Sequence, residues 1–132
     1  MIFVDTSFWI ALHVPRDQRH TDAAAALEKF HDRQLLTSSQ VRGETWTFLT
    51  RRGRHADAVR FLDRTERTAR LRVVFVTEEL EDQALRWLRR RDERRYSFVD
   101  ATSFALMRSL RVREALAFDA DFAAAGFTEL RA

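Results

Sequence analysis

Four acidic residues occupy positions that a surface role explains poorly, namely Asp5, Glu44, Asp100 and Asp119. Asp5 ends the apolar run Ile2–Val4, and Asp119 follows the apolar residues 115–118. A carboxylate beside buried apolar residues is costly unless a cation or a hydrogen-bond donor satisfies it. Several carboxylates that converge would repel one another unless a positive charge lies between them. A divalent metal ion with oxygen ligands is the simplest arrangement, so these residues predict a metal site.

Two of the acids also have a structural interpretation as helix caps. Asp5 is placed to cap a helix that begins near Phe8, but Ser7 is equally suited to that task and would leave Asp5 free for a metal. Ser97 with Asp100 three residues later resembles a capping box, although Asp is shorter than the usual Glu or Gln. The alternative places Asp100 in the first turn of a helix at the carboxyl edge of a sheet, facing Asp5.

For the other acids, the questions are where Glu44 points and whether Asp119 or Asp121 is the fourth acid of the site. We expect Glu44 on a helix, sharing with Val41 and Phe48 a face that points at the sheet and carries the carboxylate into a site. Asp119 and Asp121 compete for the fourth position, and we prefer Asp119 because it lies nearer the end of the predicted strand. Asp121 would then cap a helix, bind a second metal ion or lie on the surface.

Short apolar runs alternate with amphipathic segments along the whole chain. The runs predict strands at residues 2–5, 35–38, 72–76, 114–118 and 128–131. The amphipathic segments predict helices at residues 22–31, 40–52, 55–69, 78–91, 98–110 and 120–125, with N-terminal caps at Thr21, Ser38 or Ser39, Thr77 and Ser97 and a stop at Gly126. Continuously apolar strands separated by helices are typical of an α/β fold whose parallel sheet is covered on both faces. Functional sites in such folds lie beyond the carboxyl ends of the strands, where we expect Asp5 and Asp119.

The composition narrows the class of protein. A length of 132 residues fits one domain, and the absence of Cys excludes disulfides and thiolate metal sites. No apolar run approaches the ~18 residues of a membrane span, and the first residues do not resemble a signal peptide, so we expect a cytoplasmic protein without a membrane partner. The pI of about 10.4 arises because Lys29 is the only Lys among the cations, and Arg does not deprotonate.

Arginine is nevertheless concentrated in two stretches of the sequence. The clusters are Arg51, Arg52 and Arg54, and then Arg86, Arg89, Arg90, Arg91, Arg94 and Arg95. They are interpreted either as solvated helix ends or as a phosphate-binding rim around an acidic centre. A formal net charge of only +3 does not by itself indicate a nucleic-acid partner.

Read together and in order, the segments around the acids resemble the motifs of PIN-domain ribonucleases, specifically the toxins of VapBC toxin–antitoxin modules. The segments are Ile2-Phe3-Val4-Asp5-Thr6-Ser7, Gly43-Glu44-Thr45, Ser97-Phe98-Val99-Asp100-Ala101 and Ala117-Phe118-Asp119-Ala120-Asp121-Phe122. Each segment alone is unspecific, but four in this order across the chain are much more specific. The resemblance implies a single PIN domain over residues 1–132, a three-layer α/β/α sandwich with a central, mainly parallel sheet of four to five strands.

The resemblance also implies an activity, a cofactor and partners. The activity is endonucleolytic hydrolysis of RNA phosphodiester bonds by a water that Mg²⁺ or Mn²⁺ activates. Asp5 and Asp100 would bind the metal directly, with Glu44 and Asp119 completing the site and Asp121 in reserve. Thr6 and Ser7 would supply supporting hydroxyl groups. The expected partners are the RNA substrate, a VapB-type antitoxin whose tail lies across the active-site groove, and a second copy of the chain in a homodimer.

One residue departs from the family pattern. Members often carry Thr or Ser two residues before the fourth acid, whereas Ala117 stands there in this chain. Two alternatives remain open: an RNA-processing PIN nuclease without an antitoxin, and a catalytically inactive RNA-binding module, which the missing hydroxyl at Ala117 keeps open. A third alternative, a phosphoacceptor domain, fits the sequence poorly. The last requires a Lys near a late strand end, and Lys29 lies far too early in the chain.

Overall fold

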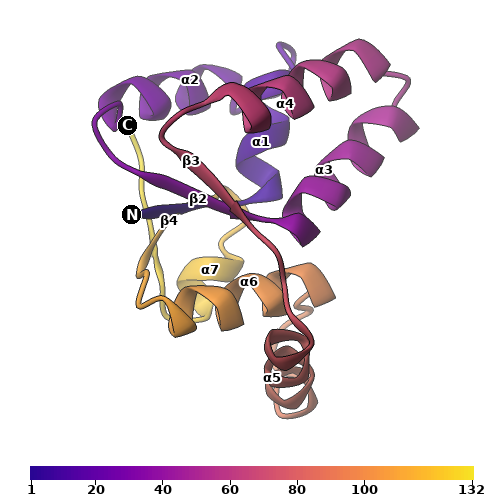
Figure 1. The fold of residues 1–132 in the computed structure, drawn as a ribbon, viewed down its shortest axis with the longest axis vertical. Coiled ribbons are helices and arrows are strands. Elements are labelled where there is room, and N and C mark those ends of the chain that lie inside the picture. Colours follow the sequence, from indigo (N-terminus) through magenta and orange to yellow (C-terminus); the bar gives the residue numbers. More distant parts are fainter.

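The computed structural model describes residues 1–132 as a five-stranded sheet between two layers of helices (Figure 1). The strands are β1 (Ile2–Val4), β2 (Leu35–Ser38), β3 (Leu71–Val74), β4 (Glu114–Leu116) and β5 (Thr128–Glu129). The helices are α1 (Thr6–His13), α2 (His20–Lys29), α3 (Ser39–Arg51), α4 (His55–Arg67), α5 (Glu78–Arg89), α6 (Phe98–Ser109) and α7 (Asp121–Ala124). Helices α1 to α4 lie on one side of the sheet and α5 to α7 on the other, which confirms the predicted three-layer fold.

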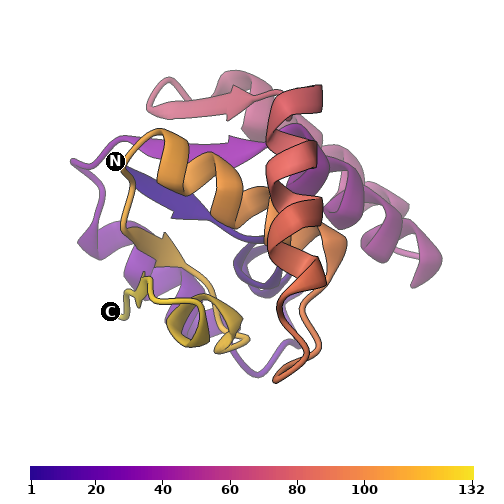
Figure 2. The ribbon, with the colours of Figure 1, turned by 90° about the horizontal axis from the view of Figure 1, so that it is seen from below.

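The order of the strands explains why distant parts of the sequence meet. The order is β3-β2-β1-β4-β5, and every neighbouring pair is parallel. The first strand is therefore central, with Ile2 opposite both Leu35 and Glu114. All carboxyl ends lie at the same edge of the sheet (Figure 2). The segments that follow β1 and β4 leave the sheet side by side, although more than a hundred residues separate them in sequence.

Burial on both faces accounts for the continuously apolar strands. Ile2, Phe3 and Val4 are fully buried, and so are Ala115 and Leu116. A parallel strand covered by helices on both faces has no solvent-facing side for polar residues to occupy. Asp5 is the first polar side chain after the apolar residues of β1, and it stands where the strand ends.

An aromatic cluster joins the second helical layer to the sheet. The ring of Phe104 in α6 lies 5.3 Å from Trp87 of α5 and 4.9 Å from Phe122 of α7. Phe122 in turn stacks on Phe3 of β1 at 5.9 Å. Phe104 of α6 therefore packs against both α5 and α7, and Phe122 of α7 connects this cluster to β1.

Several predicted element boundaries need correction. Strand β3 ends at Val74 rather than at residue 76, because the chain turns away and leaves Phe75 67% exposed. Strand β4 ends at Leu116 rather than at residue 118, since its partner β1 already ends at Val4. Helix α2 begins at His20 with Arg19 at the capping position, so the predicted cap at Thr21 is wrong.

The other predicted caps are confirmed. The side chains of Ser38, Thr77 and Ser97 each accept a hydrogen bond from a backbone N–H in the first turn of α3, α5 and α6. Gly126 follows α7 with φ of 100°, a conformation that favours glycine. No helix combines the length and the hydropathy that a membrane-spanning segment requires.

We predict that replacing Phe104 by Ala lowers the free energy of unfolding by about 3–5 kcal/mol, because a fully buried ring would leave a cavity among four other aromatic rings. Urea unfolding followed by circular dichroism measures this loss. Leu110→Ala is the control, since Leu110 is 40% exposed and its truncation should cost about 0.5 kcal/mol or less. Equal losses in the two variants would contradict the assignment of Phe104 to the core.

Candidate active site

Three carboxylates from distant parts of the chain meet beyond the carboxyl edge of the sheet. One oxygen from each of Asp5, Asp100 and Asp119 lies within 4.8 Å of the other two. We call these three residues the acid triad. They line a pocket of about 330 Å³. The other residues that line this pocket are Thr6, Ser7, Ile10, Glu44, Phe48 and Ser97.

Asp5 serves as a helix cap and as a member of the acid triad at once. Its backbone N–H donates to Leu116 at 3.0 Å, which fixes the end of β1 against β4. One carboxylate oxygen accepts from the backbone N–H and the hydroxyl of Ser7, at 3.2 Å and 2.7 Å. The expectation that Ser7 would cap α1 in its place is wrong. The short cap instead holds the Asp5 side chain, which is 2% exposed, at the mouth of the sheet.

Asp100 likewise combines the two interpretations that the sequence left open. The Ser97 hydroxyl accepts from the N–H of Asp100 at 2.9 Å, and Asp100 accepts from the N–H of Ser97 at 3.1 Å, so the capping box is present. The same carboxylate is 8% exposed and belongs to the acid triad. Helices α1 and α6 both begin at the triad, and the partial positive charge of their N-termini favours carboxylates there.

Asp119 reaches the acid triad from a turn between β4 and α7. The turn contains Ala120 in the left-handed region, with φ of 65°. Asp119 accepts from the backbone N–H of Asp121 at 3.0 Å. The Asp121 carboxylate lies outside the triad and pairs with Arg94, whose Nε donates to it at 2.5 Å. Sequence reasoning missed this pair, because nothing in the spacing connects residues 94 and 121.

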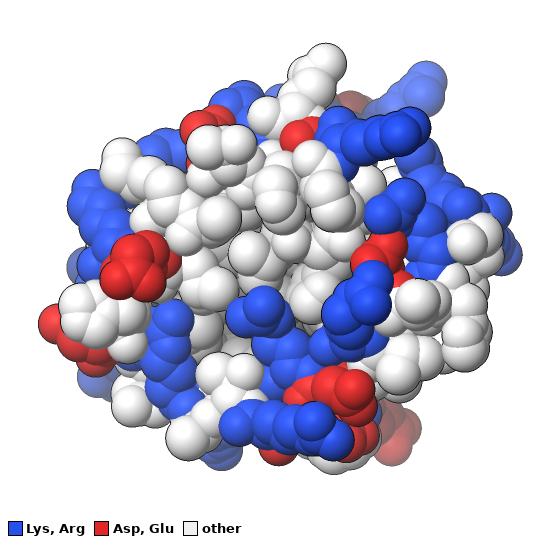
Figure 3. Space-filling model, turned by 90° about the horizontal axis from the view of Figure 1, so that it is seen from above, with Lys and Arg blue, Asp and Glu red and all other residues white.

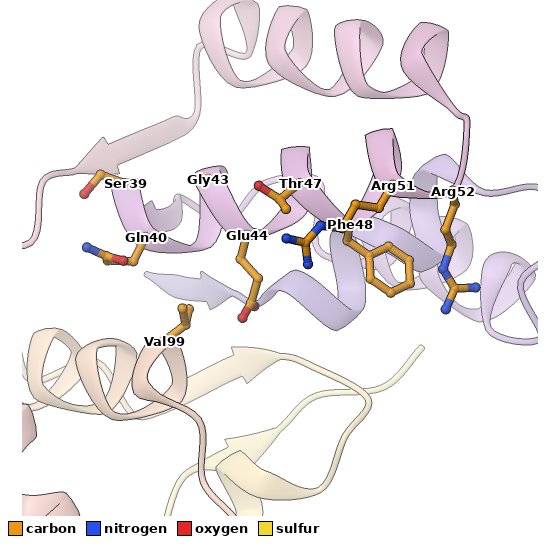
Figure 4. A pocket seen from close by; sticks show the side chains of 9 residues that line it. All are labelled: Ser39, Gln40, Gly43, Glu44, Thr47, Phe48, Arg51, Arg52 and Val99. Carbon is orange, nitrogen blue, oxygen red and sulfur yellow. The ribbon is translucent and has the colours of Figure 1, made fainter.

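Glu44 lies beside the acid triad rather than within it. Val41, Thr45 and Leu49 form the buried face of α3, so the expectation that Glu44 points at the sheet is wrong. Its side chain extends from α3 toward α6, beside Val99 (Figure 4). It forms no hydrogen bond or ion pair within the chain, and it lines both the triad pocket and the adjoining groove. Glu44 is therefore available to an incoming ligand or water.

Two hydroxyl groups border the triad in different states. The Ser7 hydroxyl donates to Asp5 and accepts from the backbone N–H of Phe118 at 3.0 Å, so it ties α1 to the turn that carries Asp119. The Thr6 hydroxyl is buried and has no hydrogen-bond partner in the chain. Ala117 is fully buried, and Ser7 is the hydroxyl that holds the turn beside it.

The acid triad has the electrostatics of a site that requires a cation. Burial, and then the charge of Asp119, raise the pKa of Asp5 well above its ordinary value. Burial raises the pKa of Asp100 to about 6 and also raises the pKa of Asp119. Full ionisation is thus unfavourable until a positive charge is added. Three carboxylates with oxygen atoms at this spacing suit a hard divalent ion such as Mg²⁺ or Mn²⁺.

A groove of about 700 Å³ continues from Glu44 along α3 (Figure 4). Arg51 and Arg52 line it, and the Arg52 guanidinium lies 4.2 Å from the centre of the Phe48 ring. Arg54 instead pairs with the buried Asp57 at 2.6 Å, so it does not belong to a rim around the triad. The groove therefore offers cations and an aromatic face directly beside the acids.

Part of the second arginine cluster lines a separate hollow between α5 and α6. Arg86, Arg90 and Arg91 line it together with Arg108, and the guanidinium of Arg91 lies 5.2 Å from the Trp87 ring. Basic side chains are not confined to the site, because Lys and Arg also surround an uncharged centre on the face that carries α2 and α4 (Figure 3). Position relative to the triad, rather than total charge, must decide which arginines serve a ligand.

Comparisons with known proteins agree on one family. A family model described as the PIN domain matches residues 2–128. Two relatives named 23S rRNA-specific endonuclease VapC20, from the CDC 1551 / Oshkosh and H37Rv strains of Mycobacterium tuberculosis, are each 53% identical over 131 residues, which cover 99% of this chain and 98% of the relative. The crystal structure of Mycobacterium tuberculosis VapC20, described as a sarcin-ricin loop cleaving toxin, superposes with a TM-score of 0.92 at 50% identity and covers all of both chains.

We predict that Asp100→Asn stabilises the metal-free chain at high pH. Burial raises the pKa of Asp100 from its ordinary 3.8 to about 6, so the native state holds a proton that the unfolded chain has lost, and stability falls as the pH rises through this window. Asn carries no charge and still accepts from the Ser97 N–H. At pH 8 the variant should exceed wild type by about 3 kcal/mol, and the gain should fall below about 1 kcal/mol near pH 4.

Urea unfolding in a chelator at pH 4.5 and pH 8 measures this difference. His13, whose pKa burial lowers to about 4, changes stability in the opposite direction over an overlapping range. It is present in both proteins, and its contribution cancels in the comparison. A variant that is less stable than wild type at pH 8 would show that Asp100 is not strained by burial.

Proposed function

Because this chain belongs to the PIN-domain family, we propose that it is a metal-dependent endoribonuclease and the toxin of a type II toxin–antitoxin system. The observation that carries the proposal is the convergence of Asp5, Asp100 and Asp119 within 4.8 Å of one another at an open pocket. The names of the relatives point to the sarcin-ricin loop of 23S rRNA as the substrate. A cytoplasmic location follows from that substrate.

The acid triad would bind Mg²⁺ or Mn²⁺ through carboxylate oxygens, with Asp5 and Asp100 as the first ligands and Asp119 as the third. When bound, such an ion lowers the pKa of a water and offsets the negative charge of the scissile phosphate. Hydrogen bonds within the chain orient these carboxylates. The caps of α1 and α6 orient two of the carboxylates, and Ser7 holds the turn that carries the third.

Glu44 and Thr6 are the groups that we assign to the attacking water and the phosphate. The Glu44 carboxylate is free of partners and faces the pocket, so it can accept a proton from a water that approaches the phosphorus. The buried Thr6 hydroxyl lacks an acceptor in the chain and can donate to a phosphate oxygen. No side chain need act as the nucleophile.

The proposed partners are RNA, a VapB-type antitoxin and a second copy of the chain in a homodimer. The groove that extends from Glu44 past Phe48 and Arg52 is where we expect the antitoxin tail to block access to the triad. An antitoxin there would exclude RNA sterically and need not alter the acids. The proposal treats residues 1–132 as one PIN domain.

The geometry of the acid triad is compatible with one of the two alternative functions and argues against the other. An RNA-processing nuclease without an antitoxin would need the same acid triad, and a neighbouring antitoxin gene is what separates it from a toxin. An inactive RNA-binding module has no need for three carboxylates whose pKa values are raised by mutual burial. Ser7 and Thr6 supply hydroxyls near the position where Ala117 lacks one, which further disfavours an inactive module.

We predict that Asp5→Asn lowers the rate of RNA cleavage by about a thousandfold or more. A neutral amide is a poor ligand for Mg²⁺, and without the ion the charge that develops in the transition state is no longer stabilised. The fold should persist, since Asn accepts the same capping hydrogen bond. A fluorescent sarcin-ricin loop RNA in Mn²⁺ measures the rate. Asp32→Asn is the matched control, because Asp32 is exposed and precedes the amino end of β2. Cleavage by wild type that persists in excess chelator would contradict the mechanism.

We predict that Arg90→Gln with Arg91→Gln weakens RNA binding and reduces its dependence on salt, since each lost phosphate contact lowers the slope of log affinity against log salt by about 1. Fluorescence anisotropy over a salt series, with the inactive Asp5→Asn chain as background, measures both quantities. Arg113→Gln is the control, because Arg113 is exposed beside the amino end of β4. The same affinity and slope in the double variant would show that this cluster is only a solvated helix end.

A further inference from the structure

Arg94 contacts the turn of the fourth acid at two points. Its Nε donates to the Asp121 carboxylate at 2.5 Å, and its Nη2 donates to the backbone carbonyl of Asp119 at 3.3 Å. Arg94 lies in the connection between α5 and α6, while both partners lie between β4 and the start of α7. Except for residues 119 and 121, no group in the chain forms a hydrogen bond or an ion pair with its side chain.

The turn that Arg94 contacts carries two carboxylates, and one residue between them has a strained backbone conformation. Asp119 and Asp121 stand two residues apart, with Ala120 at φ of 65° between them. A residue with a Cβ in the left-handed region returns to an ordinary conformation unless its surroundings prevent it. Asp119 is held by the N–H of Asp121, and Asp121 is held by Arg94. The position of the third triad ligand thus depends on a residue that is outside the triad.

Charge makes the same arrangement necessary. Asp121 places a further negative charge beside Asp119, whose carboxylate accepts from the Asp121 N–H at 3.0 Å. Without a cation on Asp121, a fourth carboxylate would be free to turn toward the acids and compete with Asp119 for the metal. A guanidinium can hold a carboxylate and a carbonyl together, because its donors form a rigid planar fork.

We propose that Arg94 is a positioning residue which selects Asp119, rather than Asp121, as the third carboxylate of the metal site. It does so by holding the Asp121 side chain outside the triad and the Asp119 backbone in place. An isolated exposed ion pair stabilises a fold little, so the role of this pair lies in the choice of ligand and not in stability. The inference rests on the proposed function, since it assumes that the triad binds a divalent cation.

A double-mutant cycle between Arg94→Gln and Asp121→Asn tests the proposal on the intact chain. Calorimetric titration with Mn²⁺ gives a readout that does not depend on cleavage. In Arg94→Gln the released Asp121 should raise Mn²⁺ affinity by about threefold or more, within the range of coupling found for residues in contact. The RNA cleavage rate should fall by about 10- to 100-fold, as for other groups that orient metal ligands. In the Asp121→Asn background, Arg94→Gln should change Mn²⁺ affinity no further.

Two additional variants separate positioning from simple charge. Arg94→Lys keeps the cation but not the fork, so it should restore wild-type Mn²⁺ affinity while recovering only part of the cleavage rate. Arg113→Gln removes one positive charge at the opposite edge of the sheet and should alter neither quantity. Thermal unfolding of all variants should remain within about 2–4 °C of wild type, since the residue is exposed.

The outcomes distinguish the failure of this inference from the failure of the proposed function. If wild type binds no Mn²⁺, or if Asp5→Asn binds it equally well, the proposed metal site is wrong and the inference falls with it. If wild type binds Mn²⁺ and Arg94→Gln binds it with the same affinity, only the inference is overturned. An effect of Arg94→Gln that persists undiminished with Asp121→Asn would also overturn it, because Arg94 would then act directly on RNA or on the metal.

Discussion

The constraint on which the rest of this structure depends is the loss of hydration of three neighbouring carboxylates, to which their mutual repulsion adds. Asp5, Asp100 and Asp119 are brought within 4.8 Å of one another, and burial raises the pKa of all three. Nothing in the apolar core compensates them. The chain limits the cost by directing the N-termini of α1 and α6 at the acids and by giving each carboxylate a backbone donor. The remaining cost becomes affinity for a cation, since a bound ion relieves all three at once.

The fold supplies this arrangement through strand order rather than through local sequence. A central first strand with β4 as its neighbour places the ends of the chain's first and fourth strands side by side. Asp5 and Asp119 then need only short connections from β1 and β4 to reach the pocket, whereas Asp100 enters it from the first turn of α6. Asp5 caps α1 and Asp100 completes the capping box of α6, so backbone hydrogen bonds fix the orientation of both side chains. The caps explain why the side chains meet with little freedom to move apart.

Much of this architecture was predictable from apolar runs and capping residues, because both are local signals. The five strands and the caps Ser38, Thr77 and Ser97 follow from such patterns. Two of the wrong predictions show what local signals do not contain. Strand ends at residues 76 and 118 were placed too late, since where a strand ends depends on its partner and not on its own hydropathy. Capping and ligation were also treated as exclusive, whereas Asp5 has two carboxylate oxygens and serves both purposes.

The hydrogen bond from the Phe118 N–H to the Ser7 hydroxyl joins residues 111 positions apart. A contact of such separation cannot form until most of the chain has left the ribosome. The same holds for the pairing of β1 with β4, which delivers Asp119 to Asp5. A nascent chain that stops between α6 and the fourth strand contains Asp5, Glu44 and Asp100 but cannot assemble the triad. The acid triad therefore comes into existence only when the polypeptide is nearly finished, and an incomplete chain has no assembled site.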